Sequence, residues 1–197
     1  MAKTFEEIDR LAMDVIFGSM YSLNFLRNIS VAIFDQKIED MTVREFHAAW
    51  LKKAKYTQHY VPYCLGAILG NLYCGILLSK QRWYDLLPED SIKDAPPEWG
   101  FADAKYNSPK KPDPSIKYAI RRIRNALGHG NISIEVPNDL DYRKDEFAFE
   151  KGSSIRFYDE DLREKSDVFE IEIPIDGLSA LVKKFQGLVY PQIIKGM

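Results

Sequence analysis

The spacing of the apolar residues changes near residue 131 and changes back near residue 176, which restricts the chain to folds that combine helices with a sheet. Between 131 and 175 apolar and polar residues alternate, and this pattern indicates a small antiparallel sheet. On both sides the apolar residues recur at helical spacing, so we expect helices at 5–34, 42–53, 62–80, 115–128 and 176–190. The sequence therefore predicts a mainly α, α+β chain: a bundle of about five helices with a β insertion at about 131–175, before the last helix.

The length of 197 residues predicts one domain over residues 1–197. Six prolines fall between residues 88 and 114. They exclude a continuous helix there and predict a Pro-rich crossover with extended pieces.

Two of the expected helices have start signals. Thr42 and Glu45 form a capping-box pattern before the second helix. Asp113 and Pro114 have the pattern of an N-cap and a first-turn proline for the helix over 115–128.

The segment VPYCLGAILGNLYCGILL (61–78) is nearly all apolar and has two interpretations. One is a transmembrane span, which the small residues Gly66 and Gly70 would suit. The other is a central helix that is buried on all sides. The segment is at the short end for crossing a bilayer and contains Pro62 and Asn71, so we favour the buried helix and expect no membrane attachment.

The composition limits the classes of site. A net charge of −2 gives no general attraction to nucleic acid, so an RNA contact requires a local basic patch. Cys64 and Cys74 would lie about 15 Å apart on one helix, too far for a disulfide, and no cysteine or histidine spacing suits zinc. The start MAKTFEEIDR has no apolar signal core. We expect a cytoplasmic protein with no metal and no other cofactor.

The helix over 115–128 combines an apolar face with several cations. At about 100° per residue, its apolar residues fill an arc of about 120° that faces the core. This arc consists of Ile116, Ala119, Ile120, Ile123, Ala126 and Leu127. Arg124 lies at the edge of the arc, near Lys117 and Arg121, while Arg122 and Asn125 lie farther round. The exposed side is therefore expected to form a local basic patch.

Arg124 and His129 supply two complementary chemical functions at the end of this helix. Arginine holds a phosphate through a planar fork of donors, and histidine takes and gives a proton near neutral pH. Together they suffice to cut RNA through its own 2′-hydroxyl without a metal. On a straight helix the two lie about 140° apart. Either Gly128 lets the chain leave the helix, or two copies of the helix build one composite cleft across a two-fold axis.

The stretch RNALGH (124–129) resembles the signature of the HEPN superfamily, α-helical proteins with an arginine, a polar neighbour and a histidine a few positions on. The arginine corresponds to Arg124, the polar neighbour to Asn125 and the histidine to His129. The β-rich insertion and the final helix resemble the plasmid-encoded bacterial branch (pEK499 p136-like). The resemblance implies a HEPN-like bundle of about four or five helices.

The resemblance also implies a metal-independent endoribonuclease that acts on RNA as a homodimer, often with an antitoxin protein or in phage defence. His129 would deprotonate the 2′-hydroxyl or protonate the leaving oxygen, and Arg124 would stabilise the phosphoryl charge. Asn125 would hold the histidine or a phosphate. A second hypothesis is a non-catalytic HEPN module that binds RNA or a protein partner through the same cleft.

Four neighbours on the helix are candidate RNA contacts. Arg121, Arg122 and Lys117 would contact the RNA backbone, and Tyr118 would stack on a base. Plainer interpretations stay open, because helix-end cations often form surface ion pairs or complement the helix dipole.

Three other features are weaker candidates. His47 and His59 lie in segments typical of structural histidines, and we expect neither to be catalytic. The acidic stretch 159–164 lacks the ligand order of a calcium loop, so we expect a solvated turn.

Overall fold

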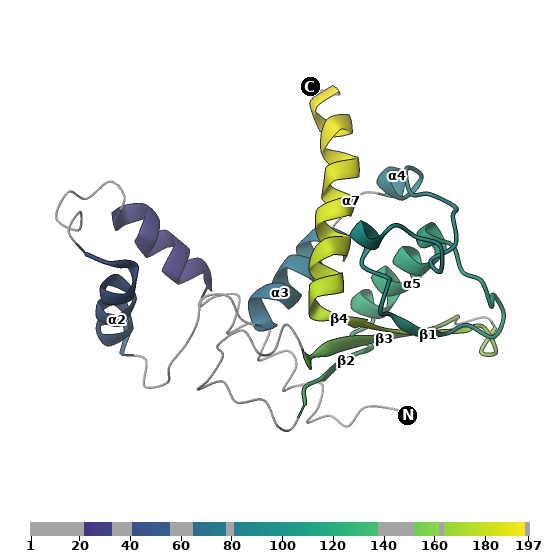
Figure 1. Cartoon of the computed structure of the whole chain (residues 1–197), viewed down its shortest axis with the longest axis horizontal. Helices are drawn as coiled ribbons and strands as arrows, with labels where there is room; N and C mark the ends of the chain where they lie inside the picture. The colour runs from purple at the N-terminus through teal and green to yellow at the C-terminus, as the bar shows by residue number, and fades with distance from the viewer. Residues whose placement is uncertain are drawn as a thin grey trace. The chain divides into compact units, whose positions relative to one another are not determined.

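The computed structural model describes residues 22–32, 41–55, 65–77, 81–137, 152–161 and 164–195. The chain divides into two compact units, residues 1–70 and 71–197 (Figure 1). That residues 1–197 behave as one domain stays a prediction. Of the expected helix 5–34, only 22–32 lies within the described residues, and it is helical.

In the N-terminal unit, the helix at 22–32 packs against α2 (Val43–Ala54). Phe25 and Trp50 form the buried contact, and the indole Nε1 of Trp50 donates a hydrogen bond to Asn24 Oδ1 at 3.1 Å. The predicted capping box is confirmed: Thr42 is the N-cap of α2, and its side chain and that of Glu45 satisfy each other's backbone N–H groups.

The apolar segment forms α3 (Leu65–Leu72) and then a π-helical turn, η2 (Tyr73–Leu77). Leu69, Leu72 and Ile76 are buried, but Asn71 and Cys74 are exposed. The expectation of a helix buried on all sides is therefore wrong, because this helix has a polar, solvent-facing side. Among the described residues, no helix is both long enough and apolar enough to cross a membrane.

The second unit contains a four-stranded antiparallel sheet in the order β1-β4-β3-β2. The strands are β1 (Lys105–Asn107), β2 (Ile132–Glu135), β3 (Ser154–Glu160) and β4 (Val168–Pro174). Phe157 pairs with Ile171, and Ile155 with Ile173, so their side chains share one face of the sheet. The predicted sheet is confirmed for β2, β3 and β4, whereas residues 138–151 of the predicted β insertion lie outside the described residues. β1 comes from the Pro-rich crossover and adds an edge strand.

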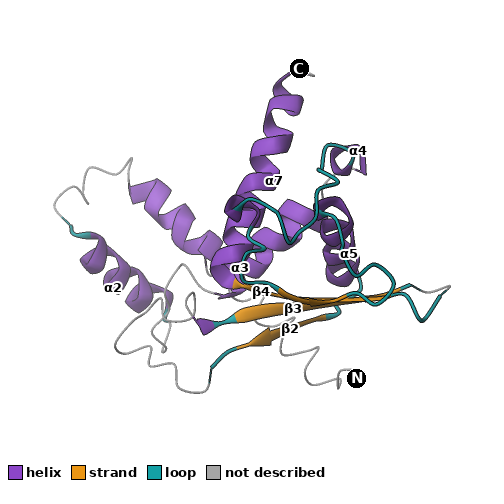
Figure 2. Cartoon of the chain, turned by 45° about the vertical axis from the view of Figure 1, so that its right-hand side comes forward, coloured by secondary structure: helices purple, strands orange, loops and turns teal. Residues whose placement is uncertain are grey.

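Two helices cover the apolar face of this sheet (Figures 1 and 2). α5 (Ile116–Gly128) lies along it, and α7 (Ile175–Lys195) begins at the end of β4 and projects away from it. η2 contacts both helices. The predicted apolar arc of α5 is confirmed, because all six of its residues are buried.

The start of α5 differs from the sequence prediction. Its N-cap is Ser115, whose hydroxyl accepts the N–H of Tyr118, and not Asp113. Pro114 lies before the helix, and its carbonyl accepts the N–H of Ile92 from the crossover. The crossover also satisfies two free N–H groups of the first turn, since Asp90 O accepts from Ile116 and Pro88 O from Lys117. The short elements α4 (Gln81–Tyr84) and η3 (Pro97–Trp99) lie before and within this crossover.

A contact between two glycines fixes the start of α7. Gly100 ends η3 with a φ of +73°, and a Cβ atom there would lie 1.8 Å from the carbonyl oxygen of Gly177. Both the backbone conformation and the close approach therefore require glycine at position 100.

We predict that Gly100→Ala lowers the free energy of unfolding by roughly 2–5 kcal/mol, because it adds left-handed strain to an overlap with backbone. Gly187→Ala is the matched control, since Gly187 lies in α7 with open space at its Cβ position. That change should stabilise by about 0.5–1 kcal/mol. Urea denaturation measures the free energy of unfolding of both variants, and equal values would contradict the proposed contact.

Candidate active site at the end of α5

The end of α5 fixes the backbone of His129. Gly130 has a φ of +68° and donates its N–H to Leu127 O at 3.1 Å, while Asn131 donates to Ala126 O at 2.8 Å. These two bonds form a Schellman motif, in which glycine adopts the left-handed conformation after the cap. His129 is the C-cap, still has right-handed helical angles, and its side chain is exposed.

Of the two alternatives, the one in which Gly128 swings His129 toward Arg124 is therefore wrong. Gly128 is the last helical residue, and the chain leaves the helix only at Gly130. His129 continues the helical path, so it projects about 140° away from Arg124. Within one chain the two side chains point to different sides of α5.

The guanidinium of Arg124 lies over an aromatic ring. Its Cζ is 5.4 Å from the centroid of the Tyr84 ring. Tyr84 is fully buried, and this burial raises the pKa of its hydroxyl to about 12, although the charge of Arg124 opposes the shift. Among the described residues, Arg124 forms no ion pair with a carboxylate.

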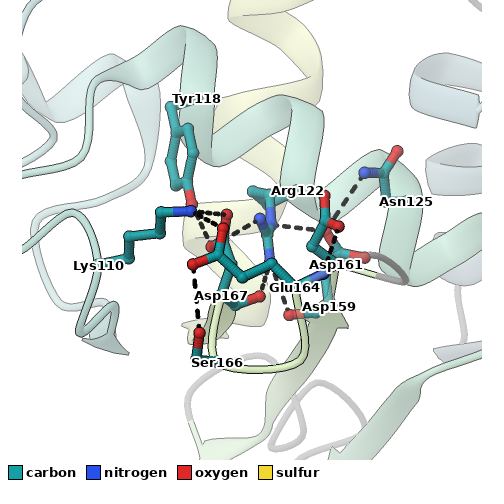
Figure 3. Close-up of polar contacts among 9 residues, drawn as sticks. All are labelled: Lys110, Tyr118, Arg122, Asn125, Asp159, Asp161, Glu164, Ser166 and Asp167. Carbon is teal, nitrogen blue, oxygen red and sulfur yellow. Dashed lines mark hydrogen bonds and ion pairs between the residues drawn. The ribbon is translucent and has the colours of Figure 1, made fainter.

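Arg122 has a different environment from the one that the helical pattern predicts. The residue is only 7% exposed, so its expected place on the solvent side is wrong. Its Nη2 donates to the carbonyls of Asp159 and Asp167, both at 2.9 Å, and Nη1 donates to Asp167 Oδ1 at 3.0 Å (Figure 3). Its Nε lies 2.5 Å from Asp159 Oδ2 as an ion pair. Arg122 is therefore occupied in joining α5 to the ends of β3 and β4.

The acidic stretch 159–164 is only partly the solvated turn that we expected. Asp159 lies in β3 and is 3% exposed, whereas Asp161 and Glu164 are exposed. The side-chain Nδ2 of Asn125 donates to Asp159 Oδ2 at 3.2 Å. Because an ionised carboxylate can only accept hydrogen bonds, the amide of Asn125 must present its N–H group to Asp159, and its carbonyl oxygen points away from Asp159 (Figure 3).

Lys110 and Tyr118 extend this cluster toward the crossover (Figure 3). Lys110 pairs with Glu164, and that hydrogen bond raises the pKa of the Lys110 ammonium group above its usual value. The Tyr118 ring packs edge-on against Phe169 and its hydroxyl contacts Asp167 at 3.4 Å, so the ring is part of the protein's packing.

The other two cations of α5 are paired with acids at, or just before, the start of the crossover. Lys117 Nζ lies 3.0 Å from Glu89, and Arg121 Nη2 lies 3.1 Å from Asp85. The hydrogen bond from Lys117 lowers the pKa of Glu89. RNA phosphates would have to replace these carboxylates.

The two other histidines were the weaker candidates. His47 stacks on Trp50 with ring centroids 5.9 Å apart, and His59 lies outside the described residues. Within the part of the chain that the structure describes, no group of three or more acidic, histidine or cysteine side chains is arranged to hold a metal ion.

We predict that Arg122→Met lowers the free energy of unfolding by about 3–5 kcal/mol, because it leaves Asp159 buried without its cation. Arg121→Met is the control, since its pair is exposed and should cost at most about 1 kcal/mol. The double variant Arg122→Met/Asp159→Leu should recover part of the loss in urea denaturation, because it removes the unpaired charge of Asp159 but leaves the carbonyls of Asp159 and Asp167 without their donor. If the double variant is less stable than Arg122→Met, unpaired charge is not the cause.

The comparisons with known proteins give one positive finding. The family model described as HEPN pEK499 p136 matches residues 6–195. No curated protein and no solved structure matches the chain. Because the family model spans nearly the whole sequence, across both compact units, the chain belongs to the HEPN pEK499 p136 family.

Proposed function

We propose that this protein is a metal-independent endoribonuclease of HEPN type that works as a homodimer, with Arg124 and His129 as its catalytic residues. Family membership supports this class of activity, since HEPN modules are often ribonucleases. The end of α5 carries an arginine and an exposed histidine in a rigid backbone setting.

One observation carries the proposal: of the four cations on α5, Arg124 alone has no carboxylate partner among the described residues. Lys117, Arg121 and Arg122 each pair with acidic side chains. A phosphate competes for a cation best where no protein anion already occupies it. Arg124 is therefore the position on this helix best suited to hold the scissile phosphate.

The chemistry follows from the two side chains. A neutral His129 takes the proton of a ribose 2′-hydroxyl, and the resulting oxygen attacks the adjacent phosphorus. The bond from phosphorus to the 5′-oxygen breaks, and a protonated histidine supplies the proton that this leaving oxygen needs. Arg124 stabilises the negative charge on the non-bridging oxygens. The products are a 2′,3′-cyclic phosphate and a free 5′-hydroxyl.

The direction of the side chains requires a second subunit. His129 and Arg124 project about 140° apart on one helix, so a single chain does not bring them to one phosphate. A two-fold axis beside α5 places Arg124 of one copy near His129 of the other. In each such pair one histidine suffices, because the imidazolium that forms when His129 takes the 2′-hydroxyl proton then supplies the proton to the leaving oxygen.

The neighbours of this pair have distinct roles in the proposal. Asn125 presents its carbonyl oxygen, which suits the N–H of an imidazole and not a phosphate oxygen. Lys117 and Arg121 contact the RNA backbone once its phosphates have displaced the carboxylates of Glu89 and Asp85. Arg122 is a structural residue in this scheme, and the packed ring of Tyr118 is a weak candidate for base stacking.

The biological setting that we propose is a bacterial toxin–antitoxin or defence system, with an antitoxin protein as a further partner and the cytoplasm as the compartment. Family membership is what supports this setting. A ribonuclease without a required metal is active wherever RNA is accessible, which is why such a protein needs an inhibitor.

We predict that the wild-type protein cleaves RNA equally well with and without chelator, and that His129→Ala lowers the rate about 10²–10⁴-fold. Arg124→Ala should lower it about 10²–10³-fold, through the loss of charge stabilisation. Lys183→Ala, which removes an exposed cation of α7, is the control and should leave the rate unchanged. The cleavage rates of the wild type and the three variants are measured by gel analysis of a labelled RNA, with detection of cyclic phosphate ends.

Two outcomes contradict this proposal. Cleavage by His129→Ala at the wild-type rate would exclude the histidine. A wild-type protein that binds RNA but never cuts it would favour the non-catalytic module instead.

A mixing experiment tests the composite cleft. We predict that an equal mixture of Arg124→Ala and His129→Ala, unfolded together and refolded, regains about a quarter of the wild-type activity. Half of the dimers are then mixed, and each mixed dimer has one intact pair of residues. A mixture that stays inactive while native mass spectrometry shows mixed dimers would mean that each pair comes from one chain.

A further inference from the structure

We infer that Tyr84 is a positioning residue for Arg124: its buried ring holds the guanidinium in place without using the donors that a phosphate needs. This inference rests on the proposed role of Arg124 in the ribonuclease site. It assigns a function to a residue far from the RNALGH stretch in the sequence, at the end of α4.

Tyr84 is itself held from two sides. Its hydroxyl donates to the carbonyl of Ile76 in the π-helical turn η2 at 2.5 Å. Its ring lies 5.6 Å from the ring of Phe185 in α7. Because the Tyr84 ring has no exposed surface, it has little freedom to move. It therefore restricts the position of the Arg124 guanidinium that lies over it.

The contact between Tyr84 and Arg124 suits a catalytic cation. The face of an aromatic ring attracts a cation without accepting hydrogen bonds from its N–H groups in the way that a carboxylate does. A carboxylate in the same place would occupy two of these N–H groups and neutralise the charge. Arg122 is held in that second way, and it is committed to structure.

The ring also reduces the entropic cost of binding. A free arginine side chain loses rotamer entropy when it is ordered. The contact with Tyr84 orders the Arg124 side chain in part before RNA binds. Less of the favourable interaction between Arg124 and the phosphate is then offset by the entropy of ordering, and more of it stabilises the charge that develops in the transition state. Loss of the ring should therefore lower kcat more than it raises KM.

The test compares Tyr84→Phe with Tyr84→Leu in the full-length protein. Phenylalanine keeps the ring and loses only the hydroxyl, so kcat should stay within about twofold of wild type. Leucine removes the ring, and kcat should fall about tenfold or more. Phe157→Leu is the matched control, because it removes a fully buried ring from the sheet and should change stability without changing kcat.

A second readout does not depend on activity. The Nε–Hε resonance of Arg124, assigned by its loss in Arg124→Lys, should be shifted by the ring current of Tyr84. The shift should persist in Tyr84→Phe and disappear in Tyr84→Leu. If Tyr84→Leu does not fold, Tyr84→Met fills the same space with a flexible side chain and takes its place.

The outcomes separate this inference from the proposed function. An unshifted resonance in the wild type, or one that Tyr84→Leu leaves unchanged, overturns the contact even if RNA is cleaved. A lost shift together with full kcat overturns the positioning role. A wild-type protein that does not cleave RNA overturns the proposed function and with it the role of Tyr84, while the resonance still reports whether the contact exists.

Discussion

A buried arginine connects the signature helix to the sheet, and the placement of the candidate site depends on it. Arg122 enters the protein interior because two carboxylates and two backbone carbonyls accept its charge and its donors. Burying a guanidinium without such partners would cost several kcal/mol. Since the partners lie at the end of β3 and before β4, α5 can take only one rotation about its axis relative to the sheet. That rotation decides which side chains of α5 face outward.

The four cations of α5 are thereby sorted into different roles, although they look alike in the sequence. Arg122 faces the sheet and is structural. Lys117 faces Glu89 of the crossover and Arg121 faces Asp85 just before it, and both carboxylates are exposed, so another anion can compete with them. Arg124 faces the buried ring of Tyr84, its Nε is buried, and no carboxylate of the described residues pairs with it. The role of each of these side chains is therefore set by the group that it contacts in the folded protein.

Local patterns predicted the parts of the fold that depend on local interactions. The capping box of α2, the apolar arc of α5 and the alternation of β3 and β4 each follow from short-range periodicity. The role of Arg122 was missed because its partners are 37 and 45 residues away. β1 has only three residues, two of them polar and exposed, so no alternation indicated it.

The sequence pattern also predicted the wrong residue as the N-cap of α5. Aspartate and serine are both good caps, and the choice between them depends on the pairing of Ser115 with Ser91.

The same rigidity gives a reason for a two-chain site. Gly130 ends the helix only after His129, so the histidine keeps its helical phase and cannot turn back toward Arg124. Arg122 holds the helix, and Tyr84 holds the guanidinium, so neither group can move far to meet the other. A second copy of the helix supplies the missing group without bending either chain. Such an arrangement links cleavage to assembly, and a partner that covers the exposed end of α5 would block both.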